Sequence, residues 1–268
     1  MSSTIAFTFG IPLLPRLGAR NWALIECLFK LTLDSILAQS DQDFRIVVAG
    51  HDRPANFPDD PRIEFLQADW PAEPQRSDNL DRGRKVHAIN ALVMARGGGL
   101  LMFVDADDWI DKHLVESART LIGPDHIGGV TTAGFATDFR TLRTAKLPDP
   151  RIFAGGFHQL CGTSTVAQLR PGHRDPLRRD PHRVLHEHYR WIELARDFGV
   201  PLVQLPSRNT YLINTSENHS ETQGPFADWR REFTRAVNAF GAPLTSEMAA
   251  SFGLELDRIR AASEAFRD

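Results

Sequence analysis

The sequence predicts an α/β fold in which a mostly parallel sheet is flanked by helices and followed by a helical extension. Two observations lead to this prediction. Over residues 5–104, short apolar runs of strand length alternate with longer segments that carry apolar side chains at helical spacing. Such alternation is typical of parallel strands joined by right-handed crossovers. The apolar run 100–104 also ends abruptly in Asp105, Asp107 and Asp108, at the strand end where such sheets bind ligands.

Each element of the first half has a local cause. Gly10 and Pro12 are expected to stop the first strand, and Gly50 is expected to stop the second. Three glycines at 97–99 end the second helix and lead into the strand that precedes the aspartates. The expected strands are 5–9, 44–49, 63–66 and 100–104, and the expected helices are 22–39 and 84–95.

The second half is less regular, because residues 128–164 are rich in glycine and have only short apolar runs. We expect an α/β domain at 1–222 and a helical extension at 223–268. The expected segments are apolar runs at 128–132 and 155–161, a polar loop at 171–181, a helix at 184–198, a strand at 200–205, a polar strand or loop at 211–220, and two helices within 226–268 that separate near Gly241 and Pro243.

Composition excludes several classes of function. The 268 residues carry a formal net charge of −3, which offers no basic surface for nucleic acid. Two cysteines, Cys27 and Cys161, fit a reducing compartment. The sequence has no apolar stretch of about 18 residues and no signal-peptide pattern, so neither a membrane span nor secretion is expected. We therefore expect a cytoplasmic protein.

Paired carboxylates follow the fourth strand. Side chains alternate between the two faces of a strand, so Asp105 and Asp107 should project from the same face. Two carboxylates on one face supply half of a site for a hard divalent cation such as Mn²⁺ or Mg²⁺, which can neutralise a bound diphosphate. The alternative is a plain acidic turn, in which Asp108 caps a helix that begins near Trp109.

Other segments should meet these aspartates at the same edge of the sheet. Pro12 follows the first strand, and Asp52 and Asp69 follow the second and third. Because the carboxyl ends of parallel strands lie at one edge, we expect these residues to share a cleft with the aspartates. This convergence of separated segments predicts a ligand site more strongly than any single motif does.

The chain resembles glycosyltransferases of the GT-A fold, close to their family 2. The likeness covers about residues 4–220, and residues 9–29 show a fainter similarity to bacterial rhamnosyltransferases. The segments that carry it are 33–40 with 44–48, 83–97, Asp105-Ala106-Asp107-Asp108 as the metal-binding motif, and 186–194 as the segment that places the catalytic base.

The resemblance implies the transfer of a sugar from a nucleoside-diphosphate sugar to an acceptor hydroxyl, with inversion at the sugar. Asp107 would hold the cation, with Asp105 on the nucleotide side. Lys85 would pair with the diphosphate, and Asn90 would either contact the sugar donor or bond to neighbouring backbone. His219 would return to the metal or the phosphates, unless it is a surface histidine.

Two positions depart from the family pattern. Gly50 and His51 stand where the family has acidic residues that hold the nucleobase, and Asp52 is displaced by one position. The base segment usually reads Glu-Asp but here reads Glu187-His188, so either residue can be the base. We favour Glu187 slightly as the residue that points into the cleft.

Rival interpretations remain open at this point. Zinc binding by glutamate and histidine around residues 182–188 is disfavoured, because the sequence has no His-Glu-x-x-His motif. A nucleotidyltransferase would need a Gly-rich basic loop after the first strand, where only Gly10 and Gly18 occur. A noncatalytic binding or scaffold protein that keeps the fold is the third interpretation.

An apolar stripe runs along the expected helix after residue 226. We expect it to pack against the catalytic domain or the partner in a homodimer. The alternative is an inner-membrane surface, where a lipid-linked acceptor would replace a soluble carbohydrate. The residues of the stripe are Phe226, Trp229, Phe233, Val237 and Phe240.

Overall fold

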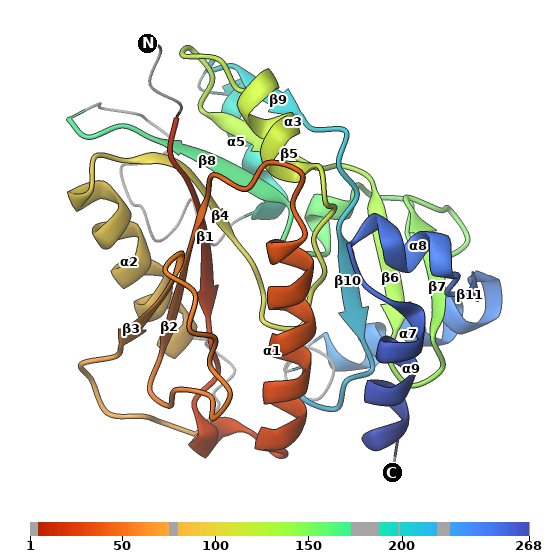
Figure 1. The fold of residues 1–268 in the computed structure, drawn as a ribbon. Helices are drawn as coiled ribbons and strands as arrows, with labels where there is room; N and C mark the ends of the chain where they lie inside the picture. Colours follow the sequence, from red (N-terminus) through yellow and green to blue (C-terminus); the bar gives the residue numbers. More distant parts are fainter. Residues whose placement is uncertain (1–4, 75–79, 173–187, 198, 219–225, 268) are drawn as a thin grey trace.

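The computed structural model describes residues 5–74, 80–172, 188–197, 199–218 and 226–267, which form two sheets that lie side by side (Figure 1). The larger sheet has the strand order β3-β2-β1-β4-β8-β5-β9. All pairings in it are parallel except those of β8, which is antiparallel to both of its neighbours. Its strands are β1 (Phe7–Pro12), β2 (Arg45–Gly50), β3 (Ile63–Gln67), β4 (Gly99–Phe103), β5 (Gly128–Val130), β8 (Thr165–Leu169) and β9 (Leu202–Gln204).

Helices cover both faces of the larger sheet, as the alternation of side chains along its strands requires. On one face, α1 (Trp22–Leu37) and α3 (Leu114–Leu121) pack against residues such as Phe9, Val48 and Met102. On the other face, α2 (Leu80–Ala95) and α5 (Trp191–Asp197) pack against the alternate residues of the same strands. The predicted α/β fold with a mostly parallel sheet flanked by helices is therefore confirmed.

A smaller sheet was not expected from the sequence. Its order is β10-β6-β7-β11, with β6 (Gly134–Asp138), β7 (Arg143–Leu147), β10 (Thr210–Ile213) and β11 (Ala242–Pro243). The C-terminal region forms three helices rather than the two expected, because Gly253, at a φ of +67°, separates the last two. They are α7 (Ala227–Phe240), α8 (Ser246–Ser251) and α9 (Leu256–Ala265), and single turns of 3-10 helix occur at η1 (Arg16–Gly18), η2 (Phe157–Gln159) and η4 (His188–Arg190).

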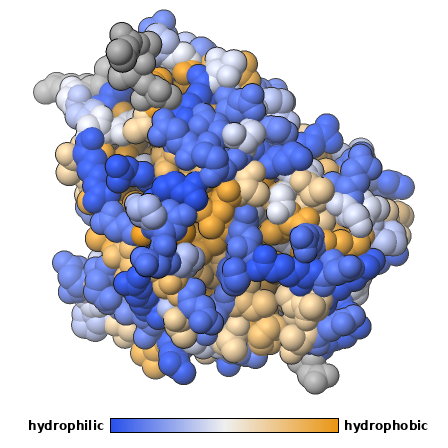
Figure 2. Space-filling view, viewed as in Figure 1, coloured by the Kyte–Doolittle hydropathy of each residue, from blue (hydrophilic) through white to orange (hydrophobic). Residues whose placement is uncertain are grey.

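The C-terminal helices share their core with the rest of the chain. Phe252 and Ile259 pack in one apolar cluster with Leu28 of α1 and Trp109. The stripe along α7 is divided: Phe233 and Val237 are buried against the smaller sheet, whereas the other three members are exposed. Within the described residues, no helix is long and apolar enough to cross a bilayer. The face shown in Figure 2 is largely hydrophilic, with apolar areas interspersed.

Gly10 and Pro12 do not end the first strand early, which corrects the expectation from the sequence. Both belong to β1, and Pro12 is its last residue, in register with Ala49. A Cβ atom at Gly10 would lie 2.9 Å from Cγ2 of Ile89 and 3.0 Å from the ring of Phe103. The glycine therefore allows α2 to pack closely against the sheet. Gly10 is explained by this tertiary contact and does not mark the end of the strand.

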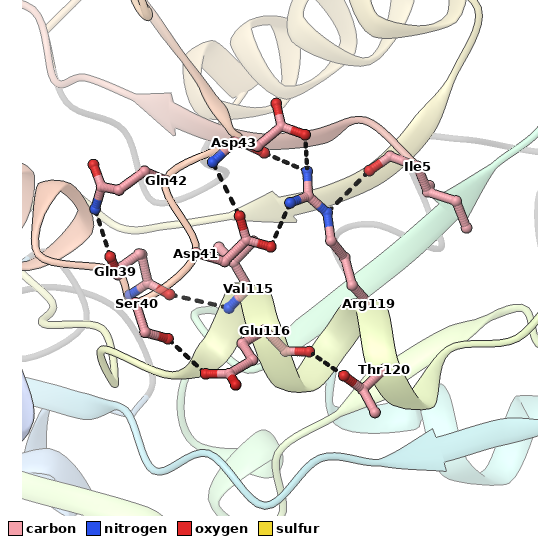
Figure 3. A network of polar contacts seen from close by, with 10 residues as sticks. All are labelled: Ile5, Gln39, Ser40, Asp41, Gln42, Asp43, Val115, Glu116, Arg119 and Thr120. Carbon is pink, nitrogen blue, oxygen red and sulfur yellow. Dashed lines mark hydrogen bonds and ion pairs between the residues drawn. The ribbon is translucent and has the colours of Figure 1, made fainter. Parts of the chain in front are cut away.

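A polar network fixes α3 to the chain that surrounds it (Figure 3). Arg119 donates from Nη1 to Asp41 Oδ2 at 2.5 Å and from Nε to the carbonyl oxygen of Ile5 at 3.1 Å. The backbone N–H of Val115 donates to Gln39 Oε1 at 3.0 Å. These bonds join α3 to the loop after α1 and to the entry of β1, so they stabilise the scaffold on which the aspartates after β4 are held.

Candidate active site

A cleft of about 360 Å³ opens at the carboxyl ends of β1 and β4, and segments from both sheets line it. The predicted residues Pro12, Lys85, Asp105, Asp107 and His188 all line this cleft. The ligand site expected at this edge of the sheet therefore has a cavity, and the two aspartates lie in it.

Other predicted residues lie elsewhere. Asp52 does not line the cleft and accepts a hydrogen bond from the backbone N–H of Arg16 at 2.8 Å. Asp69 is exposed outside the cleft, and Asn90 is buried on α2. Glu187 and His219 lie outside the described residues.

Arg82 forms an ion pair with Asp105 that sequence reasoning missed. Its Nη2 lies 2.9 Å and its Nε 3.2 Å from Asp105 Oδ1. The backbone N–H of Asp105 donates to Thr163 Oγ1 at 3.0 Å, which anchors the same residue from the other side. The sequence did contain a signal for Arg82. It lies three residues before Lys85 on α2, and residues three apart on a helix lie on one face, so both should face the same cleft. Arg82 places a fixed cation in the cleft next to the paired carboxylates.

Lys85 is buried and joins α2 to the segment after β1. Its Nζ donates to the carbonyl oxygen of Leu13 at 2.7 Å and to Asp81 Oδ2 at 2.5 Å. Burial lowers the pKa of Lys85, while the neighbouring carboxylates of Asp81 and Asp52 oppose that shift. The ammonium group therefore holds one wall of the cleft in place, whether or not it also reaches a diphosphate.

Lys85→Met is expected to destabilise the protein and to weaken binding in the cleft. The variant leaves the buried carbonyl of Leu13 without this donor, at a cost of about 1–3 kcal/mol, and removes the ion pair with Asp81, whose carboxylate keeps its hydrogen bond from Trp70 Nε1. Chemical denaturation measures the loss. Lys30→Met is the matched control, because Lys30 forms an exposed i,i+4 pair with Asp34. Equal stability of the two variants would contradict this role.

Asp108 does not cap a helix, which corrects the expectation that it caps a helix beginning near Trp109. The nearest helix, α3, begins at Leu114, and Trp109 instead forms a bridge with Thr210. Asp108 is fully buried and accepts hydrogen bonds from Thr163 Oγ1 at 2.5 Å, from the backbone N–H of Leu212 at 3.0 Å and from Cys161 Sγ at 3.2 Å. Burial, followed by the charge of Asp105, raises the pKa of Asp108 to about 7. Asp108 thus ties the aspartate turn to the smaller sheet.

His188 is held by a backbone carbonyl from η2. Its Nδ1 lies 2.5 Å from the oxygen of His158, and because a carbonyl only accepts hydrogen bonds, this contact assigns the proton to Nδ1. The lone pair of the neutral ring is then on Nε2. Burial lowers the pKa of His188 below its ordinary 6.5, although the hydrogen bond to His158 opposes the shift. The imidazole is therefore neutral at pH 7.

Gly162 borders the point at which Arg82, Asp105 and His188 come together. A Cβ atom there would lie 3.4 Å from Asp105 Oδ2, 3.4 Å from Nη2 of Arg82 and 3.7 Å from Cδ2 of His188. The segment 157–163 therefore orients the imidazole, borders the aspartates and carries the threonine that binds both Asp105 and Asp108. In the irregular, Gly-rich sequence of this segment, only a short apolar run was recognisable, and it did not predict a part in the site.

Residues 16–219 match the family described as "Putative rhamnosyl transferase". No curated protein shows detectable sequence similarity to the chain. Among solved structures, the chain is similar to S. aureus TarS at 10% identity, over 94% of this chain and 44% of that one, with a TM-score of 0.42. The chain thus spans less than half the length of TarS.

Two further structures are similar in their overall arrangement. A 4-diphosphocytidyl-2C-methyl-D-erythritol synthase is matched at 15% identity, over 87% of this chain and all of that one, with a TM-score of 0.36. Glucosyl-3-phosphoglycerate synthase from Mycobacterium tuberculosis, solved with Mn²⁺, UDP and glucosyl-3-phosphoglycerate, is matched at 12% identity over 93% and 81%, with a TM-score of 0.34. Because the family match spans more than half of the chain, this chain belongs to that family of rhamnosyl transferases, a class of glycosyltransferase.

Proposed function

We propose that the protein transfers a sugar of the rhamnose type from a nucleoside-diphosphate donor to an acceptor hydroxyl, with inversion and with a divalent cation at Asp105 and Asp107. The description of the matching family supports the proposed class of sugar. The observation that carries the proposal is the meeting, in one cleft, of two carboxylates with a histidine whose Nδ1 is held by a backbone carbonyl. A soluble carbohydrate or a lipid-linked sugar is the proposed acceptor, and the cytoplasm the proposed location.

The donor set fits a hard cation. Asp105 and Asp107 both line the cleft and supply carboxylate oxygens, which Mn²⁺ and Mg²⁺ prefer. Among the described residues, no group of three or more histidine, cysteine, aspartate or glutamate side chains could hold a metal ion, so a cation at these two aspartates would need further ligands such as diphosphate oxygens and water. When bound, the cation would neutralise the negative charge that develops on the departing diphosphate. His219, the third ligand expected from the sequence, lies outside the described residues.

Arg82 adds a second source of positive charge. Its guanidinium contacts Asp105 and is one of the groups that surround Gly162. A guanidinium in this position can bind phosphate oxygens in a bidentate manner while it holds the carboxylate. Arg82 is therefore assigned to orienting both Asp105 and the diphosphate.

His188 is proposed as the base. An inverting transfer needs a group that removes the proton of the acceptor hydroxyl while its oxygen attacks the anomeric carbon. The Nε2 lone pair of a neutral imidazole can accept that proton, and the resulting positive charge is stabilised by the carbonyl oxygen of His158 at Nδ1. Glu187, which the sequence slightly favours, lies outside the described residues. The position of His188 in the cleft and its contact with the carbonyl of His158 support His188 as the base.

His188→Gln is expected to lower kcat by about 10²–10⁴-fold and to leave the affinity for the sugar donor nearly unchanged, because a base acts mainly in the transition state. In the wild type, kcat/KM should fall as pH decreases, since protonation removes the lone pair. The midpoint should lie below 6.5, because burial lowers the pKa of His188.

The assay is release of nucleoside diphosphate against pH in the presence of Mn²⁺. His113→Gln is the matched control, because His113 is an exposed histidine beside Ser40 and outside the cleft. Near-normal turnover of His188→Gln, with an unchanged acid limb, would refute the assignment of the base.

A further inference from the structure

We propose that Arg230 forms a subsite for an anionic group on the acceptor, so that the protein glycosylates a hydroxyl compound that carries a phosphate or a carboxylate. This inference rests on the proposed transfer reaction and adds the chemical class of its acceptor. Arg230 belongs to α7, in the C-terminal region, and it lines the same cleft as Asp105 and His188.

Among the described residues, Arg230 has polar and aromatic neighbours and forms no ion pair with a carboxylate. Its Nη1 donates to the hydroxyl oxygen of Tyr211 at 3.1 Å, and its Nη2 lies 3.5 Å from the carbonyl oxygen of Leu160. The guanidinium carbon lies 5.3 Å and 5.1 Å from the ring centroids of Tyr211 and Trp229. Its Nε is buried, and within the described ranges it has no hydrogen-bond partner. These contacts orient the guanidinium without neutralising it.

Among the described residues that line the cleft, the lysine and the other arginine are paired with carboxylates. Arg82 binds Asp105, and Lys85 binds Asp81. Glu217 also lines the cleft, but its carboxylate accepts the backbone N–H groups of Arg20 and Asn21 at 3.0 Å and 2.7 Å. Among the described residues, no carboxylate forms an ion pair with Arg230. A partly buried guanidinium of this kind is satisfied best by an anion, which it can bind through charge-assisted hydrogen bonds.

The position of Arg230 favours the acceptor over the sugar donor. The carboxylates that would hold the cation and diphosphate follow β4 of the larger sheet, whereas Arg230 comes from the helix that covers the smaller sheet. Arg230 contacts the carbonyl of Leu160, and two residues earlier the carbonyl of His158 orients the proposed base. Two residues of extended chain span at most about 7 Å. An anion at Arg230 would therefore be bound beside the same chain segment that orients His188.

A purely structural role is the competing explanation. In that case Arg230 would only brace Tyr211 and Leu160 against α7. Within the part of the chain that the structure describes, the buried Nε has no hydrogen-bond partner and the guanidinium has no carboxylate partner, which favours a ligand, because bracing alone leaves the charge and one donor unsatisfied. The two explanations differ in what they predict for small anions, which makes them separable by binding measurements.

The test compares glucose 1-phosphate, glucuronate and methyl glucoside by titration calorimetry on the full chain. The wild type is expected to bind at least one of the two anionic probes about 10-fold or more tightly than methyl glucoside, as a charge-assisted hydrogen bond would give. The comparison of glucose 1-phosphate with glucuronate shows whether the subsite prefers a phosphate or a carboxylate. Arg230→Gln should abolish the preference, and Arg230→Lys should keep part of it.

A second arm measures Mn²⁺-dependent binding of UDP, dTDP and GDP to the same variants. It should be unchanged in Arg230→Gln if Arg230 serves the acceptor. The proposal would be overturned if Arg230→Gln lost nucleotide binding but kept the wild-type preference among the sugar probes. It would also be overturned if the wild type showed no preference for the anionic probes, a result that does not depend on the folding of any variant. Failure of all three nucleotides to bind the wild type would instead count against the proposed function itself.

Discussion

Asp107→Asn is expected to abolish sugar transfer, with a fall in kcat/KM of at least about 10²–10³-fold, the loss typical when one electrostatic stabiliser of a transition state is removed. The amide removes one negative charge and one metal-binding oxygen from a site with two carboxylates. The increase in nucleotide affinity that Mn²⁺ gives should also become smaller in this variant. The fold should survive, because the residue lies in the cleft and not in the core.

Turnover with a nucleoside-diphosphate sugar, measured against Mn²⁺ concentration, checks this expectation. Asp59→Asn is the matched control, since Asp59 is exposed and lies outside the cleft. Wild-type activity in Asp107→Asn would show that the strand-end carboxylates do not hold a catalytic cation.

The largest loss of stability is expected for Asp108→Ala. The variant leaves the hydroxyl of Thr163 and the backbone N–H of Leu212 without an acceptor in a fully buried site. Each unsatisfied group costs about 1–3 kcal/mol, so the free energy of unfolding should fall by about 2–6 kcal/mol. Activity should fall too, because Thr163 also accepts the backbone N–H of Asp105.

The pH dependence of stability distinguishes the charge of Asp108 from its hydrogen bonds. The folded protein raises its pKa to about 7, so the protonated form is the one that folding favours. With a metal chelator present, the contribution of protonated Asp108 to the free energy of unfolding is complete below about pH 4. It is lost as the pH rises towards 7. Asp108→Asn should flatten that slope. Denaturation of Asp108→Ala and Asp108→Asn between pH 4 and 7 tests both points, and a wild-type stability for Asp108→Ala would contradict them.

Local patterns predicted the parts of the fold that depend on sequence neighbours. The helical spacing at 22–39 became α1 at Trp22–Leu37, and Asn21 caps it by accepting the N–H of Leu24 at 3.2 Å. The position of Asp105 and Asp107 directly after an apolar strand also predicted a cleft at that edge, although Asp107 lies in a turn beyond β4, so alternation along the strand is not the cause. At Gly10 the same reasoning failed, because the glycine accommodates Ile89 of a helix 79 positions later in the chain.

Features that depend on distant contacts could not be predicted. The roles of Asp108 and Gly162 follow from residues brought together by the two sheets: Thr163 lies 55 positions after Asp108, and Leu212 lies 104 positions after it. Arg230 is one of several arginines on an amphipathic helix, and only the packing of α7 on the smaller sheet directs it to the cleft. Periodicity identifies which face of a helix is apolar, but it does not specify which polar residue at the edge of that face lines a site.

Thermal denaturation with UDP, dTDP and GDP, each with and without Mn²⁺, tests the central claim most directly. The proposed function predicts that at least one nucleotide raises the Tm of the wild type in the presence of Mn²⁺, because a ligand that binds only the folded state stabilises it. It further predicts that the cation dependence is lost in Asp107→Asn and kept in Asp59→Asn. An identical shift with and without Mn²⁺, or an unchanged response in Asp107→Asn, would contradict a cation-dependent nucleotide-sugar site at these aspartates.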